Sequence, residues 1–173
     1  MYGVSAYYLA TVATTVTMFI LYPISLTLTS FFFYDFDEHS LGALMDWMFI
    51  LTLAGLAGGF WGISFGSLFT NEVTAVQLQM FFIILFNLGG GLYANTGDDV
   101  NFVVQGITYI SPMRYTTELL LNQVLEGKES GEFLLDLLGF TWGNSTCVML
   151  LLNFIFVCFA GGWLILLYKT WYF

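Results

Sequence analysis

Long apolar runs, separated by single charges or short polar stretches, organise the sequence. A helix rises about 1.5 Å per residue and needs about 20 apolar residues to cross about 30 Å of hydrocarbon. Four runs satisfy that length, and we expect membrane spans at residues 11–33, 47–70, 74–96 and 146–169. The pattern therefore predicts an all-α membrane protein of about four transmembrane helices.

The segment at residues 98–145, before the last span, is neither a plain loop nor a full span. Its apolar part, residues 100–113, is too short to cross the bilayer, which predicts a re-entrant or interfacial segment. After Ser111 and Pro112, apolar and charged residues alternate at helical spacing. This pattern predicts an amphipathic helix opened by a serine cap and a first-turn proline.

Two opposite charges, Arg114 and Glu118, lie four residues apart in that predicted helix and share one face. Pairing at this spacing would make both charges tolerable at the membrane boundary. Two interpretations remain open: a partly buried pair with a structural role, or a wet surface pair that contributes about 0.3 to 0.5 kcal/mol.

Composition narrows the classes of function. Of the 173 residues, 58% are hydrophobic and 9% are charged, against about 25% charged in a soluble domain. Three basic residues and twelve acidic ones give a net charge of −9, so no basic patch exists to bind nucleic acid. The only histidine, His39, follows three acidic residues on a short turn. Adjacent residues on such a turn rarely converge on one ion, so we expect no metal site.

One pattern is typical of a catalytic site. Gly62, Ser64 and Gly66 match the G-x-S-x-G sequence of serine hydrolases. A nucleophilic serine needs a base, and the only histidine lies between spans, so we expect no catalytic residue and keep an intramembrane hydrolase as a minor hypothesis. The sequence also contains no Walker A, G-x-G-x-x-G or H-E-x-x-H motif. Any energy source must therefore lie elsewhere.

Glycines in the second expected span predict close helix packing. Gly58, Gly62 and Gly66 repeat every four residues, and Gly55 and Gly59 form an adjacent row. Small residues at this spacing let another helix backbone approach closely. We favour generic helix packing over a dedicated dimer seam.

Pro23 interrupts the first expected span. A proline inside a helix frees the carbonyl four residues earlier and kinks the helix. Nearby hydroxyls can satisfy carbonyls freed in this way, and the sequence supplies them at Thr17, Ser25, Thr27 and Thr29.

Asn87 is the one strongly polar side chain deep in the third expected span, and Met80, Ile84 and Gly91 share its face. Polar residues inside a membrane either bond to another helix or line a solute path. Both interpretations remain open.

Three stretches, in order, carry a resemblance to a known family: residues 2–9 (YGVSAYYL), residues 89–95 (GGGLYAN) and residues 110–115 (ISPMRY). They resemble the membrane domain of ABC exporters of the G subfamily, the white and multidrug-resistance type. The first is similar to the entry into that family's third helix. The second is similar to its glycine-leucine-leucine valve, with Leu92 at a plug leucine and Tyr93 departing from the pattern.

The third stretch is the most specific and is similar to the family's Ser-Pro-x-Arg-Tyr segment. The residues that carry this motif are Ser111, Pro112, Arg114, Tyr115 and Glu118. The resemblance implies that the four spans are helices three to six of a six-helix ABC-2 type domain. This chain would then be a fragment, with the ATPase domain and the first two helices outside it.

The resemblance further implies the transmembrane domain of an ATP-driven exporter for lipids, sterols or other amphipathic molecules. A second such domain, identical or different, would complete the path, which Met80, Ile84, Asn87, Gly91 and Leu92 would line. ATP and Mg would bind a nucleotide-binding domain of the full-length protein, and this chain would hold no cofactor of its own. The setting would be the plasma membrane or an intracellular membrane of a eukaryote. The rival hypothesis is a non-transporting four-helix scaffold or assembly protein, in which glycine rows only pack helices.

Few charges are present to set the topology. Lys169 marks the terminal side, and Arg114 and Lys128 lie on the other. Asn144 begins an Asn-Ser-Thr sequon on the same side as the long polar segment, which makes it a glycosylation candidate on an extracellular or lumenal face. We expect both termini in the cytoplasm.

This topology predicts that a cysteine placed at Glu129 is accessible from outside the cell. An impermeant thiol reagent applied to intact cells should label the Glu129→Cys variant. Protection of that cysteine would reverse the predicted topology.

Overall fold

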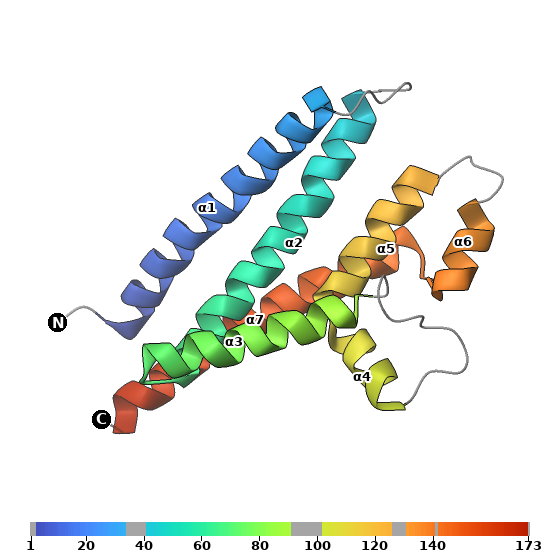
Figure 1. The fold of residues 1–173 in the computed structure, drawn as a ribbon. Coiled ribbons are helices and arrows are strands. Elements are labelled where there is room, and N and C mark those ends of the chain that lie inside the picture. The colour runs from blue at the N-terminus through green and yellow to red at the C-terminus, as the bar shows by residue number, and fades with distance from the viewer. Residues whose placement is uncertain (1–2, 34–40, 91–101, 126–130, 141, 173) are drawn as a thin grey trace. The chain divides into compact units, whose positions relative to one another are not determined.

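The computed structural model describes residues 3–33, 41–90, 102–125, 131–140 and 142–172 (Figure 1). All regular elements in these residues are helices, which confirms the all-α prediction. In order they are α1 (Val4–Phe33), α2 (Leu41–Leu68), α3 (Glu72–Leu88), α4 (Phe102–Ile110), α5 (Pro112–Leu125), α6 (Gly131–Leu138) and α7 (Asn144–Tyr172).

The chain forms two compact units. The first unit comprises Met1–Gln79 and Leu152–Phe173, and the second unit comprises Met80–Leu151. The first unit thus contains α1, α2 and most of α7, and the second contains α4, α5 and α6.

Three described helices are long and apolar enough to cross a membrane: Val4–Ser30, Leu41–Leu68 and Asn144–Trp171. The helix at the third expected span, α3, is apolar but has 17 residues, which rise about 26 Å. That length is short of about 30 Å of hydrocarbon. The part of the expected span beyond Gly90 lies outside the described residues. The chain is a multi-pass membrane protein, as its apolar runs predicted.

In the first unit, α1 and α2 run side by side in opposite directions (Figure 1). Two glycines of α2 allow this contact. A Cβ at Gly59 would lie 2.6 Å from the ring of Phe19 in α1, and a Cβ at Gly55 would lie 3.0 Å from the Phe19 carbonyl oxygen. Gly58 and Gly66, in contrast, have no described neighbour within 4 Å of the Cβ position. Generic packing is therefore confirmed for the Gly55 and Gly59 row, and the other row is not used in this contact.

Pro23 lies buried in α1 and removes the donor that would bond the Phe19 carbonyl. The nearby hydroxyls bond other carbonyls: Thr27 Oγ1 donates to Pro23 O at 2.7 Å. The remaining three likewise donate within α1, to the carbonyls of Ala13, Tyr22 and Ser25. The expectation that these hydroxyls satisfy the freed carbonyl was therefore wrong. The Phe19 carbonyl instead faces Gly55, where no side chain blocks the approach.

Two hydroxyls fasten α1 and α2 to the middle of α7. Tyr8 is 1% exposed and donates to Phe159 O at 2.7 Å, and Ser64 donates to the adjacent Cys158 O. Gly162 makes room for both, because a Cβ there would lie 2.9 Å from the Tyr8 hydroxyl and 3.0 Å from Ser64 Oγ. Hydrocarbon contains no water, so these carbonyls satisfy hydroxyls that would otherwise be costly to bury. Ser64 thus serves helix packing, and this geometry gives no support to the hydrolase hypothesis.

Shorter helices make up the region between α3 and α7. With nine residues, α4 is too short to cross a bilayer, as expected for a re-entrant or interfacial segment. Pro112 is the first residue of α5, as the first-turn proline predicted. By contrast, α6 lies in a stretch for which the sequence predicted no helix.

A single methyl group added to α7 tests the contact of the two hydroxyls. Gly162→Ala places a Cβ against both hydroxyls and 3.2 Å from Ser64 Cα, so we expect destabilisation of about 1 to 3 kcal/mol. Gly161→Ala is the matched control, because no described atom lies within 4 Å of its Cβ position and alanine favours a helix by about 1 kcal/mol. The thermal midpoint in detergent should fall for the first variant and hold or rise for the second. Equal midpoints would contradict the contact.

Candidate functional site

The polar position predicted inside the membrane lies on an open face of α3. Met80 and Ile84 are each 59% exposed, and Asn87 is exposed on the same face. Asn87 Nδ2 donates to the Ile83 carbonyl at 2.8 Å, within its own helix. Among the described residues, no group donates to its side-chain oxygen. The face therefore presents two apolar side chains and one amide acceptor.

The other two predicted path residues, Gly91 and Leu92, lie outside the described residues. Their place in a valve stays a prediction. His39 and the acidic residues before it also lie outside the described residues.

The end of α3 is held by the Ser-Pro segment. Ser111 is fully buried, and its hydroxyl donates to Phe86 O at 2.7 Å, one residue before Asn87. The sequence predicted Ser111 as a side-chain cap of α5, but the hydroxyl bonds α3 instead. Gly89 lets α4 approach, since a Cβ there would lie 3.1 Å from Ile107 Cγ2. These contacts fix the last turn of α3 and with it the amide of Asn87.

Arg114 is 4% exposed and bonds the turn that follows α6. Its Nη2 donates to Gly139 O at 3.0 Å. Gly139 has φ of 71°, and Phe140 N donates to Leu135 O at 2.9 Å, so the glycine ends α6 in a left-handed cap. The guanidinium carbon also lies 5.1 Å from the centre of the Tyr109 ring, within the range of a cation–π contact.

Glu118 is fully buried and bonds the same turn. Its Oε1 accepts a hydrogen bond from Trp142 N, while Oε2 has no hydrogen-bond partner among the described residues. The Cys147 thiol, in the first turns of α7, lies close enough to interact with this carboxyl. Arg114 and Glu118 thus each hold main-chain groups of the segment between α6 and α7.

The predicted ion pair between Arg114 and Glu118 is not formed directly. Each side chain takes a main-chain partner, and Arg114 Nε, like Glu118 Oε2, is buried without a hydrogen-bond partner among the described residues. The hypothesis of a wet surface pair is wrong, because both residues are buried. The predicted helix after Ser111 and Pro112 forms as α5, but its two charges lie buried and not on a face exposed to water. The two charges attract each other without a direct hydrogen bond. We call Arg114 and Glu118 the buried support, because they hold the segment between α6 and α7.

Aromatic rings enclose this support. Trp142 lies 6.0 Å from Tyr109 and 5.9 Å from Tyr115, measured between ring centres, and the Tyr115 hydroxyl donates to Tyr109 O. The motif residues Ser111, Pro112, Arg114, Tyr115 and Glu118 are all buried. The structure thus brings the whole predicted motif together around α5. Sequence reasoning missed Trp142 and Gly139, although a glycine after an apolar helical stretch is a recognisable cap signal.

Burial sets the electrostatics of the support. Removal from water raises the pKa of the Glu118 carboxyl above its ordinary 4.5, and the Trp142 N–H and Arg114 oppose that rise. Removal from water also raises the pKa of Tyr115 above its ordinary 10.0, against the opposing effect of Arg114. Because burial dominates in both groups, the neutral carboxyl and the neutral phenol are favoured relative to water.

Asn144, the glycosylation candidate, lies exposed in the first turn of α7. Its Oδ1 accepts a hydrogen bond from Asn122 Nδ2 of α5 at 2.8 Å. Glycosylation at this residue stays a prediction.

Comparison with known proteins identifies a family for these elements. Residues 1–125 match the family described as ABC-2 type transporter, which is well over half of the chain. The matched region includes α1 to α5, and therefore the open face of α3 and the motif residues of α5. No curated protein matches the chain.

A pH series tests the burial of Glu118. A carboxyl whose pKa is raised in the folded state binds its proton more tightly there, so lowering the pH through that pKa towards 4.5 adds stability. Glu118→Gln keeps an acceptor for Trp142 N but cannot titrate. Between about pH 8 and pH 5, the thermal midpoint of the wild type should therefore rise relative to that of this variant.

Asp136→Asn, which removes an exposed carboxyl of α6, is the control. Its thermal midpoint should rise relative to that of Glu118→Gln over this pH range, as the wild-type midpoint does. A constant difference between the wild type and Glu118→Gln across this pH range would contradict the burial of a titrating carboxyl.

Proposed function

This chain belongs to the ABC-2 type transporter family, and on that premise we propose that α3 lines the translocation path of an ATP-driven exporter. The chain is the transmembrane part of an ABC-type transporter. The narrower proposal adds a place in the G subfamily, a second membrane domain that completes the path, and export of lipids, sterols or other amphipathic molecules. ATP and Mg would act in a nucleotide-binding domain of the full-length protein.

One observation supports this proposal most strongly: the exposed amide of Asn87 in an apolar helix. A polar side chain that faces lipid is costly, so such residues usually face a protein partner or a water-filled cavity. Asn87 lies between exposed apolar residues, and its oxygen accepts no hydrogen bond from the described residues. This exposure favours a solute path, completed by a second membrane domain, over a hydrogen bond to another helix of this chain.

The chemistry of the face favours amphipathic substrates. Met80 is flexible and polarisable and can adapt to varied apolar shapes, and Ile84 extends the apolar surface. The Asn87 amide offers one hydrogen-bonding position beside them. A molecule with a large apolar body and one hydroxyl or headgroup matches this arrangement, whereas a strongly charged solute has no counter-ion on the described part of the face.

The buried support of α5 contributes rigidity. Ser111 bonds the last turn of α3, and Arg114 and Glu118 bond the segment before α7. A binding face functions best when the elements behind it are held in one arrangement. The motif residues therefore position the path and do not contact the substrate.

The competing function is a membrane scaffold or assembly protein without transport. In a scaffold, the α3 face would pack permanently against another helix, and ATP would drive no movement of lipid. The family match favours the transporter, because the family takes its description from transport.

Alanine variants of two residues of α3 test the proposed path. Asn87→Ala removes the amide, and Leu78→Ala removes an exposed apolar side chain on the opposite side of α3, about two and a half turns away. With the full-length protein in vesicles, ATP-dependent movement of a fluorescent phospholipid and of a fluorescent sterol would be measured. Losing one hydrogen bond of about 1 kcal/mol should weaken the apparent affinity roughly five-fold in Asn87→Ala.

Leu78→Ala should stay within about two-fold of the wild type, since it lies on the opposite side of α3. Equal effects of the two variants would contradict a path along Asn87. Absence of any ATP-dependent movement by the wild type would favour the scaffold.

A further inference from the structure

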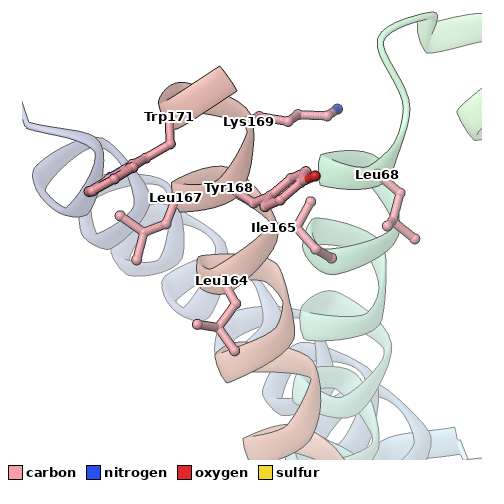
Figure 2. Close-up of a pocket in the computed structure, with 7 residues that line it drawn as sticks. All are labelled: Leu68, Leu164, Ile165, Leu167, Tyr168, Lys169 and Trp171. Carbon is pink, nitrogen blue, oxygen red and sulfur yellow. The ribbon is translucent and has the colours of Figure 1, made fainter. Parts of the chain in front are cut away.

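An apolar groove opens at the C-terminal ends of α2 and α7, both in the first unit (Figure 2). It has a volume of about 890 Å³, and most of its lining is aliphatic, including Leu68 of α2 and Leu164 and Ile165 of α7. Figure 2 shows Lys169 extending from the last turns of α7, with Tyr168 projecting toward the end of α2. The groove is thus apolar along its length and carries a single cation near one end.

The cation has no counter-ion of its own. Lys169 forms no ion pair with any described residue. Glu72, the first residue of α3, is the acidic residue that follows Leu68 most closely in the sequence. It forms no salt bridge with Lys169. A lysine in the last turn complements the helix dipole, which accounts for the charge but not for the apolar groove beneath it.

The separation of Lys169 and Leu164 along α7 matches the thickness of the interfacial layer of a bilayer. Lys169 and Leu164 are five residues apart, which is about 8 Å along the helix. The headgroup layer measures roughly 5 to 8 Å on each side of the hydrocarbon. When the ammonium lies at the level of the phosphates, Leu164 therefore reaches the first carbons of the acyl chains.

Exposed aromatic residues support the same placement. Trp171 is 88% exposed and Tyr168 is 65% exposed, and both line the groove. Tryptophan and tyrosine are enriched at membrane–water interfaces, where the ring meets lipid and the polar group meets the headgroups. These two rings mark the end of α7 as an interfacial position.

We propose that this groove binds an anionic phospholipid. The phosphate lies against the Lys169 ammonium, and the glycerol and upper acyl carbons lie along the aliphatic wall between α2 and α7. Charge complementarity selects the anionic headgroup, because the described lining supplies one cation and no acid. The bound lipid would join the ends of two helices that face each other across the groove. This site is separate from the proposed path on α3 and does not depend on it.

Fluorescence quenching by brominated lipid tests the site, since Trp171 lies in its lining. The full-length protein is reconstituted in phosphatidylcholine vesicles that contain a minor fraction of brominated phosphatidylglycerol or, separately, brominated phosphatidylcholine. The quenching lost in Trp171→Phe reports lipid at the end of α7, where the groove opens. One lysine near an anionic headgroup should favour the brominated phosphatidylglycerol roughly five-fold.

Substitutions of Lys169 test whether the lipid preference depends on the positive charge or only on the shape of the side chain. Lys169→Gln should abolish the preference for the anionic lipid, and Lys169→Arg should retain it. Thr170→Val, at the exposed neighbouring position, is the control and should also retain it. Thermal melting checks that each variant is folded.

Three results would overturn the proposal. They are equal quenching of the wild type by the two lipids, an unchanged preference in Lys169→Gln, and no quenching at Trp171 by either lipid. The last result would show that another part of the full-length protein covers the groove. The comparison of the two lipids in the wild type holds even where a variant fails to fold.

Discussion

The folded structure depends on side-chain hydrogen bonds that reach main-chain groups of distant elements. In the described residues, Tyr8 and Ser64 reach α7, Ser111 reaches α3, and Arg114 and Glu118 reach the segment between α6 and α7. In hydrocarbon each unsatisfied polar group costs several kcal/mol, so such bonds restrict the arrangements available to the helices. They act as fixed points between elements that otherwise meet through interchangeable aliphatic surface.

Glycine is the second half of this arrangement. A side-chain hydroxyl reaches a carbonyl of another helix only when the two backbones are close, and Gly162 provides that closeness on α7. Gly55 and Gly59 do the same where α2 meets α1 at Phe19. Gly139 contributes differently, since its left-handed conformation ends α6 and leaves its carbonyl to accept from Arg114. At Gly162, the glycine lets the backbones approach, and the hydrogen bonds of the two hydroxyls stabilise that approach.

The buried charges of α5 hold main-chain groups of the segment between α6 and α7. Arg114 and Glu118 are buried without a direct bond to each other, and each retains one polar atom without a hydrogen-bond partner among the described residues. Such an arrangement is weak evidence for stability, because buried charges carry a large desolvation penalty. The two bonds do constrain geometry, since Arg114 holds the Gly139 carbonyl and Glu118 holds the Trp142 N–H. The open face at Asn87 is thereby attached to a rigid end of α3 through Ser111.

The sequence by itself determined the class of protein and most of its helices, because apolar runs of span length and a lack of charge permit little else. It also located the start of α5 at Pro112, since a proline at the first turn has a local cause. Only the tertiary structure decided the partners of Ser111, Arg114 and Glu118, because these partners are main-chain groups that every residue possesses and no sequence pattern marks. Only the tertiary structure decided which glycine row of α2 meets α1, because both rows have the spacing for close packing and the position of Phe19 selects the row of Gly55 and Gly59.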